Sequence, residues 1–319
     1  MSKEPDARPN KTGTRLLVAV VGPTASGKSA LALRAAEILG GEIVNCDAIQ
    51  LYRGLDVGTA KPSLEERKRL PHHLYDLIGP AEPYSAGRYM VDARCVCSQI
   101  ADRGGIPFVV GGTGLYLRVL LEGIFRGPGR SEAIRERLDR IAERKGVEYL
   151  HALLSLKDPA AGQRIQARDQ LRIVRALEIY FSTGSRISQL QVRKQPLKGL
   201  AVLKLGLNLP RDVLYGRINR RVARMFDEGF TEEVERLLDE GYRDDCKAFE
   251  ALGYRYVLRV LRGELSQLKA IELTCRDTRR YAKRQMTWFR KEPQIRWIDF
   301  PGESPQALEQ LLALAESSG

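Results

Sequence analysis

The chain has 319 residues, of which 43% are hydrophobic, so it can bury a full core and form two domains or one domain with a large insertion. A run of about 18 apolar residues is absent, which excludes a membrane span, and the polar segment 1–14 excludes a secretory signal and favours a disordered tail. The five cysteines match neither metal-site nor disulfide spacings, which favours a reduced, cytoplasmic location.

The net charge of +12 is concentrated in the second part of the chain. Residues 1–124 hold 15 Lys and Arg against 13 Asp and Glu, whereas residues 125–319 hold 37 against 27. A small anionic substrate needs only a few cations, so the wider excess indicates a nucleic-acid partner. The alternative is charge that serves solubility alone.

Strands and helices alternate through the first part of the chain. The predicted strands cover 15–22, 42–47 and 107–112, and the predicted helices cover 28–39, 85–103 and 113–122. Such alternation predicts a parallel sheet with helices on both faces, which is an α/β fold.

The pattern changes after FRGPGR at 125–130. Residues 131–191 are predicted to be helical, a strand returns at 201–209, and helices then lead to a short strand at 294–299. A helical excursion between strands of one sheet indicates an inserted subdomain. We therefore predict a tail at 1–14, a catalytic core at 15–124 and 200–300, and a helical insertion at 125–199 that binds the nucleic acid. The C-terminal tail at 301–319 is predicted to be a weak helix with little chemical content.

The strongest local motif is GPTASGKS at 22–29, which fits G-x-x-x-x-G-K-[ST] between a predicted strand and a predicted helix. Its glycines let backbone N–H groups surround a phosphate, and the positive end of the helix adds to the attraction. Lys28 supplies a full charge, and the Ser29 hydroxyl can bind Mg²⁺. The expected phosphate-binding residues are Gly22, Thr24, Ala25, Ser26, Gly27, Lys28 and Ser29.

Three further parts of the sequence resemble the tRNA dimethylallyltransferase (isopentenyltransferase) family. They are NCDAIQLYRGLDVGTAKP at 45–62, VVGGTGLYLRVLLEG at 109–123, and the pair ALGYRYV at 251–257 and RRYAKRQMTWFR at 279–290. The resemblance implies a P-loop kinase-like core with a helical insertion, and a channel that dimethylallyl diphosphate and a flipped-out adenine enter from opposite ends. It also implies transfer of the dimethylallyl group to N6 of the adenosine 3′ of the anticodon, release of diphosphate, and Mg²⁺ as cofactor.

Asp47 is the candidate general base. The exocyclic amine of adenine is a poor nucleophile, and a carboxylate that accepts one of its protons assists bond formation. Asp47 ends a predicted parallel strand, where open α/β sheets place their chemistry, and the family's catalytic aspartate falls at this position. The family usually has Ser at the next position, where this chain has Ala48, so a hydroxyl contact is absent or replaced.

Two further catalytic residues are assigned through the resemblance. It places the Thr113 hydroxyl near the diphosphate and the adenine, although a Gly-Gly-Thr turn alone is more typical of a strand exit with a helix cap. Arg217, Arg221 and Arg224 share one face of a predicted helix, which by itself indicates a solvated surface. The resemblance assigns Arg221 to the leaving diphosphate, whose charge suits a guanidinium.

The resemblance also implies contacts with the anticodon stem-loop of tRNA. The segment 276–291 adds seven cations and one acid, with aromatic residues that we interpret as core. The implied tRNA contacts are Asp47, Ala48, Ile49, Gln50, Thr113, Arg135, Leu171, Arg172, Arg175, Glu250, Gly253, Tyr254 and Arg255.

Other functions remain open from the sequence. An adenylate isopentenyltransferase performs the same chemistry on a free nucleotide but has no use for the basic second part. A small-molecule P-loop kinase accounts for the phosphate motif alone, since the same cradle binds ATP, and a non-catalytic nucleic-acid-binding NTPase accounts for the charge alone. We expect a monomer.

Overall fold

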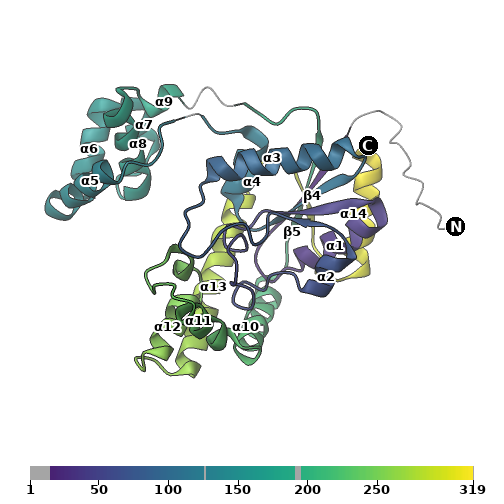
Figure 1. Ribbon diagram of the computed structural model, residues 1–319. Coiled ribbons are helices and arrows are strands. Elements are labelled where there is room, and N and C mark those ends of the chain that lie inside the picture. The colour runs from purple at the N-terminus through teal and green to yellow at the C-terminus, as the bar shows by residue number, and fades with distance from the viewer. Residues whose placement is uncertain (1–14, 126, 191–194, 319) are drawn as a thin grey trace. The chain divides into compact units, whose positions relative to one another are not determined.

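The computed structural model describes residues 15–125, 127–190 and 195–318, so the predicted tail at 1–14 lies outside the described residues. The chain divides into two compact units (Figure 1). The first comprises 1–120 and 197–319, and the second comprises 121–196.

A six-stranded parallel sheet forms the centre of the first unit, which confirms the predicted fold class. Strand β1 is central because it pairs with β4 on one side and with β5 on the other. His72 and His73, which the sequence analysis did not predict as a strand, pair at one edge. The strands are β1 (Leu16–Val21), β2 (Gly41–Asn45), β3 (His72–His73), β4 (Ile106–Gly111), β5 (Ala201–Leu207) and β6 (Ile295–Ile298). Across the sheet they lie in the order β3-β2-β4-β1-β5-β6.

Helices cover both faces of this sheet. The helices of the first unit are α1 (Lys28–Leu39), α2 (Leu64–Arg69), α3 (Ala86–Asp102), α4 (Gly114–Glu122), α10 (Arg211–Asp227), α11 (Phe230–Asp239), α12 (Tyr254–Leu261), α13 (Gln267–Phe289) and α14 (Pro305–Ser318), with a 3₁₀ turn at Lys247–Glu250. Among the described residues, no helix has the length and apolar character needed to cross a membrane.

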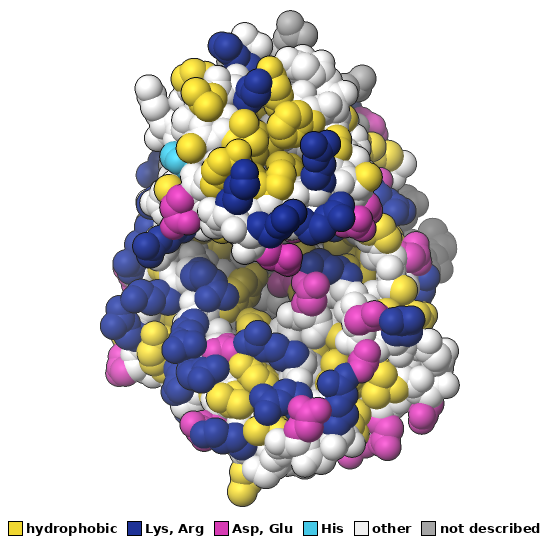
Figure 2. Space-filling model, turned by 90° about the vertical axis from the view of Figure 1, so that its left-hand side faces the viewer, with side chains coloured by type: hydrophobic (Ala, Val, Ile, Leu, Met, Phe, Trp, Pro, Cys, Tyr) yellow, Lys and Arg dark blue, Asp and Glu magenta, His cyan; other side chains and the backbone are white. Residues whose placement is uncertain are grey.

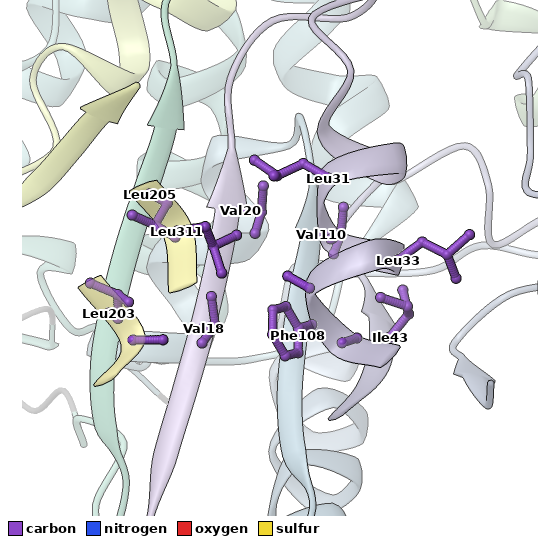
Figure 3. Close-up of a cluster of buried hydrophobic side chains, with 14 of the residues drawn as sticks. Val18, Val20, Leu31, Leu33, Ile43, Phe108, Val110, Leu203, Leu205 and Leu311 are labelled. Carbon is purple, nitrogen blue, oxygen red and sulfur yellow. The ribbon is translucent and has the colours of Figure 1, made fainter. Parts of the chain in front are cut away.

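The core on one face of the sheet explains why the strands read as continuous apolar runs. Val18 and Val20 of β1 point to the same side, together with residues of the neighbouring strands, and meet Leu31 of α1 (Figure 3). All three are completely buried. Alternate residues such as Leu17 are also completely buried, because helices cover the opposite face too.

The C-terminal segment is helical, as expected, but it packs into the core of the first unit instead of forming a tail. Residues 305–318 form α14, and Ala307, Leu311 and Ala315 are buried in the same core as β1 (Figure 3). These residues recur at a spacing of four, which places them on one helix face. Burial of this face makes the C-terminal segment part of the first unit.

The second unit consists of helices and has a core of its own. Leu138, Leu150 and Ile173, which come from three different helices, are almost completely buried in this core. The helices are α5 (Glu132–Lys145), α6 (Val147–Lys157), α7 (Pro159–Arg164), α8 (Gln170–Thr183) and α9 (Ile187–Leu190). Separate burial of apolar residues is what allows 121–196 to form a compact unit inside the chain.

Candidate active site

The loop between β1 and α1 has the backbone of a phosphate cradle. Gly22 has a φ of 138° and Gly27 a φ of 93°, both in the region that favours glycine. Ala25 between them also has a positive φ, 63°, a strained conformation of the kind that clusters at ligand sites. Helix α1 starts directly after the loop at Lys28, so its free N–H groups face the loop.

Three charged groups lie near one another beside this loop. The Lys28 ammonium donates a hydrogen bond of 2.7 Å to the carbonyl of Pro23. Burial, and secondly the charge of Arg221, lower the pKa of Lys28 to about 7, while Asp47 opposes the shift. Burial also lowers the pKa of Arg221, again against the influence of Asp47. The structure thus brings together the predicted base, the P-loop lysine and the predicted diphosphate arginine.

Asp47 is held by a local turn at the carboxyl end of β2. Its backbone N–H donates to the side-chain oxygen of the buried Asn45, at 2.9 Å, and its own Oδ1 accepts from the N–H of Ile49, also at 2.9 Å. Asn45 is itself fixed by a hydrogen bond to the carbonyl of Leu74. The carboxylate is therefore oriented through its backbone and one oxygen, which leaves Oδ2 for a substrate proton.

Thr113 is positioned where β4 leads into α4. Its Oγ1 accepts a hydrogen bond of 3.1 Å from the backbone N–H of Ala48. The two loops that follow β2 and β4 are thus joined, and the contact uses the main chain, so it forms although this chain has Ala48 where the family usually has Ser. A side chain at Gly111 would meet the backbone of Cys46, which explains why a glycine stands there.

Gln285 of α13 is a site residue that the sequence analysis missed. Its Oε1 accepts from the N–H of Thr24 in the phosphate loop, and its Nε2 donates to the carbonyl of Gly112, both at 2.9 Å. Gln285 therefore ties the phosphate loop to the turn that carries Thr113. The signal that could have found it is an uncharged Gln among the cations of 276–291.

Residues 302–303, assigned to the predicted tail, lie against the phosphate loop instead. The N–H of Gly302 donates to the carbonyl of Ser26 at 3.0 Å, and a side chain at Gly27 would come within 2.6 Å of Glu303. Arg217 joins the two segments, because its Nε donates to the carbonyl of Ala25 at 2.7 Å and its Nη2 pairs with Glu303 at 2.5 Å.

A methyl group at Gly302 should therefore disturb the phosphate loop. In Gly302→Ala the new Cβ would collide with the carbonyl of Gly27, so the two segments must separate. Because small displacements of binding groups are costly, we expect the KM for the phosphate substrate to rise by roughly tenfold or more. The KM for the expected nucleic-acid substrate should stay nearly constant. Gly87→Ala, whose Cβ meets only a side chain at 3.7 Å, is the control, and equal kinetics of both variants would contradict the expectation.

The residues of the second unit that are predicted to contact nucleic acid differ in their exposure and in their ion-pair partners. Arg135 and Arg175 both pair with the buried Glu178, at 2.9 Å and 2.6 Å. Burial alone would raise the pKa of Glu178, but the hydrogen bonds from these arginines and from the N–H of Ser131 outweigh it and lower the pKa to about 2. Both arginines thus have a structural partner. Arg172 also has a partner, Asp169 at 3.3 Å, but its side chain is 67% exposed.

Among the predicted contacts near α12, Tyr254 needs correction. Its side chain is completely buried and its hydroxyl donates to Glu233 at 2.6 Å, so it is a core residue rather than a surface contact. Arg255 is exposed and pairs with Asp277, and Glu250 is exposed and pairs with Lys247. Tyr254 is inaccessible because it lies, with Val257 and Leu258, on the buried face of α12.

Among the other predicted contacts, Leu171 is 80% exposed, while Ile49 and Gln50 are half-buried in the loop that follows Asp47. The backbone of Gly253 is buried against Phe230.

A β-strand that runs through such a loop into a helix, in a parallel sheet, is the arrangement of a P-loop-like α/β fold. Opposite the loop, this chain carries a carboxylate and an arginine from different elements, a combination suited to proton acceptance and to stabilising a leaving anion.

Comparisons with known proteins narrow this class to one family. A family model described as IPP transferase matches residues 50–292, and one described as isopentenyl transferase matches residues 15–74. Curated relatives include two proteins named tRNA dimethylallyltransferase. The one from Geobacter sulfurreducens is 49% identical over 294 residues, 92% of this chain and 94% of the relative. The one from Koribacter versatilis is 45% identical over 304 residues, 95% of this chain and 99% of the relative.

Solved structures agree. The tRNA isopentenylpyrophosphate transferase of Bacillus halodurans matches with a TM-score of 0.69 and 38% identity, over 95% of this chain and 98% of that one. A eukaryotic dimethylallyltransferase acting on tRNA matches with a TM-score of 0.78 and 26% identity, over 95% of this chain and 78% of that one. The chain belongs to the IPP transferase family.

Proposed function

We propose that this chain is a tRNA dimethylallyltransferase, which transfers a dimethylallyl group from dimethylallyl diphosphate to N6 of the adenosine 3′ of the anticodon. The observation that carries the proposal is the convergence of Asp47, Lys28 and Arg221 beside the phosphate loop. Family membership supports the same reaction, because relatives over nearly the whole chain bear this name.

The donor diphosphate fits the cradle of the phosphate loop. Backbone N–H groups at the start of α1 and the Lys28 ammonium bind the anion, and the Arg221 guanidinium approaches from α10. The bond between N6 and the dimethylallyl carbon forms as the bond from that carbon to the diphosphate oxygen breaks. The diphosphate leaves with the electron pair of the broken bond, and the two cations stabilise its growing charge.

Asp47 takes the proton that the adenine amine must lose. Its Oδ1 is engaged by the N–H of Ile49, so the proton goes to Oδ2. The Thr113 hydroxyl, which already accepts from Ala48, can donate its own proton to a diphosphate or adenine acceptor.

Mg²⁺ is the proposed cofactor, and the residues fit its preferences. Ser29 is exposed in the first turn of α1, where its hydroxyl provides one oxygen ligand. The described residues contain no group of three His, Cys, Asp or Glu that could hold a metal ion, and Mg²⁺ commonly uses few protein ligands together with substrate phosphates and water. When bound, Mg²⁺ neutralises part of the diphosphate charge.

For the tRNA, the exposed cations are the supporting feature. Lys and Arg side chains gather on the face turned to the viewer in Figure 2. Exposed cations of α13 include Arg276, Arg280, Lys283 and Arg284, and Arg172 of α8 is exposed as well. We propose that the protein acts as a monomer in the cytoplasm, where its five described cysteines would stay free thiols.

The decisive experiment offers the purified protein dimethylallyl diphosphate with either unmodified tRNA or AMP. We expect a mass gain of one dimethylallyl group on the tRNA only. Affinity for tRNA should also fall with rising salt, because bound phosphates release counterions. Modification of AMP but not tRNA would establish the adenylate isopentenyltransferase alternative, and consumption of ATP without either product would indicate a kinase.

A further inference from the structure

Glu233 of α11 is a buried carboxylate that the proposed reaction does not use. Its side chain is almost out of contact with water, at 5% exposed. It accepts hydrogen bonds from the backbone N–H groups of Asp56 at 2.7 Å, Val57 at 2.6 Å and Gly58 at 3.2 Å. The hydroxyl of Tyr254 donates a fourth, at 2.6 Å. A buried charge is tolerated only with such compensation, so these donors and this carboxylate require one another.

The backbone that Glu233 binds is packed closely against the same helices. A side chain at Gly58 would collide with the ring of Phe230 and come within 2.7 Å of the ring of Tyr254. Farther along this loop, the buried ammonium of Lys61 donates to the carbonyl of Tyr52 at 2.8 Å. The same ammonium pairs with Asp56 and Asp76, each at 2.6 Å. Segment 56–61 is thus fixed at both ends.

Between these two fixed ends lies the carbonyl of Thr59. It accepts a hydrogen bond of 2.9 Å from Nη2 of Arg221 and one of 3.2 Å from the side-chain amide of Gln50. Arg221 in turn acts electrostatically on Lys28 and on Asp47. The Thr59 carbonyl therefore helps to hold the guanidinium of Arg221 near the phosphate loop.

We propose that Glu233, together with Tyr254, is a positioning residue that fixes segment 56–59 and thereby aims Arg221 at the leaving diphosphate. The chain of contacts runs from the carboxylate through three backbone N–H groups to the Thr59 carbonyl and from there to the guanidinium. Glu233 touches neither substrate. Its effect on turnover rests on the proposed function, whereas its effect on diphosphate binding does not.

Glu233→Gln tests this role because it keeps the shape of the side chain. The amide nitrogen cannot accept a hydrogen bond, so some of the four donors lose their acceptor and the segment must shift. We expect the affinity for inorganic pyrophosphate, measured by calorimetry, to fall by roughly tenfold, the usual range for a misplaced charged hydrogen bond. Glu232→Gln, an exposed neighbour on the same helix, should leave the affinity unchanged.

A double-mutant cycle separates positioning from general damage. In an Arg221→Ala background, Glu233→Gln should cause little further loss of pyrophosphate affinity, because the group that it aims is gone. Tyr254→Phe, which keeps the carboxylate and its three amide donors, should show a smaller loss with the same dependence on Arg221. Equal losses with and without Arg221, or a normal affinity in folded Glu233→Gln, would overturn the proposal. Absence of tRNA modification by the wild type would refute the proposed function but leave this binding test valid.

Discussion

Replacing Asp47 by Asn should lower the turnover number for prenyl transfer by about a hundredfold or more, the range assigned to general-base catalysis. An amide cannot accept the adenine proton, but its oxygen can still accept the hydrogen bond that Ile49 donates to Oδ1 at 2.9 Å. The loop should therefore keep its shape, and tRNA affinity should change little, since proton acceptance matters only as the new bond forms. Single-turnover rates at saturating tRNA and dimethylallyl diphosphate measure the effect.

The control for this variant is Asp102→Asn at the end of α3. Asp102 is exposed and pairs with Arg15 before β1, at the edge of the sheet opposite to the carboxyl ends of the strands. The turnover number of the Asp102→Asn variant should be normal. A decrease of less than about fivefold in Asp47→Asn would assign the proton to another acceptor.

The sheet and the phosphate loop could be predicted because their signals are local. Each strand is a short apolar run, and buried strands covered on both faces need no alternation. The motif at 22–29 contains its own glycines, lysine and serine, so its chemistry does not depend on distant segments. Asp47 could be predicted for the same reason. It directly follows a strand of the parallel sheet, and the carboxyl ends of such strands lie at the same edge as the phosphate loop.

The supporting contacts of the site could not be predicted, since they join residues far apart in the chain. Gln285 meets Gly112 across 173 positions, and Glu233 meets Asp56 across 177. In the sequence, Glu233 is an ordinary acid on an amphipathic helix that would be expected in water. Only the fold shows that its helix faces the loop after Asp47.

Two of the predicted tRNA contacts have partners within the protein. Tyr254 is aromatic and lies next to an exposed arginine, yet its hydroxyl is used by Glu233. Arg135 resembles a phosphate contact in the sequence, but it pairs with the buried Glu178, and its removal would leave that carboxylate short of a partner. Arg172, 67% exposed, is the better position for testing RNA contact in the second unit.

Lys28 should give the second large effect, on the binding of the donor. Its pKa is lowered from 10.5 to about 7 by burial and then by Arg221. Between pH 7 and 10.5 the unfolded chain thus binds more protons at this position than the folded protein, and this contribution to stability rises with pH across that window. An arriving diphosphate favours the charged amine, so binding above pH 7 should take up a proton, and the affinity should fall as the pH rises.

Calorimetry of pyrophosphate binding in buffers of different ionisation enthalpy measures this proton uptake directly. Lys28→Ala should lose it and should bind pyrophosphate roughly thirtyfold more weakly or worse, because a desolvated charge partner is removed. The matched control is Lys269→Ala, which replaces an exposed lysine that pairs with Glu272 on α13, and it should behave like the wild type.

A competition experiment on the wild type tests the same loop. Pyrophosphate should compete with dimethylallyl diphosphate, and ATP should compete poorly. Normal kinetics with dimethylallyl diphosphate in Lys28→Ala would show that the donor does not bind at this loop. Strong competition by ATP would show that the loop binds a nucleotide instead.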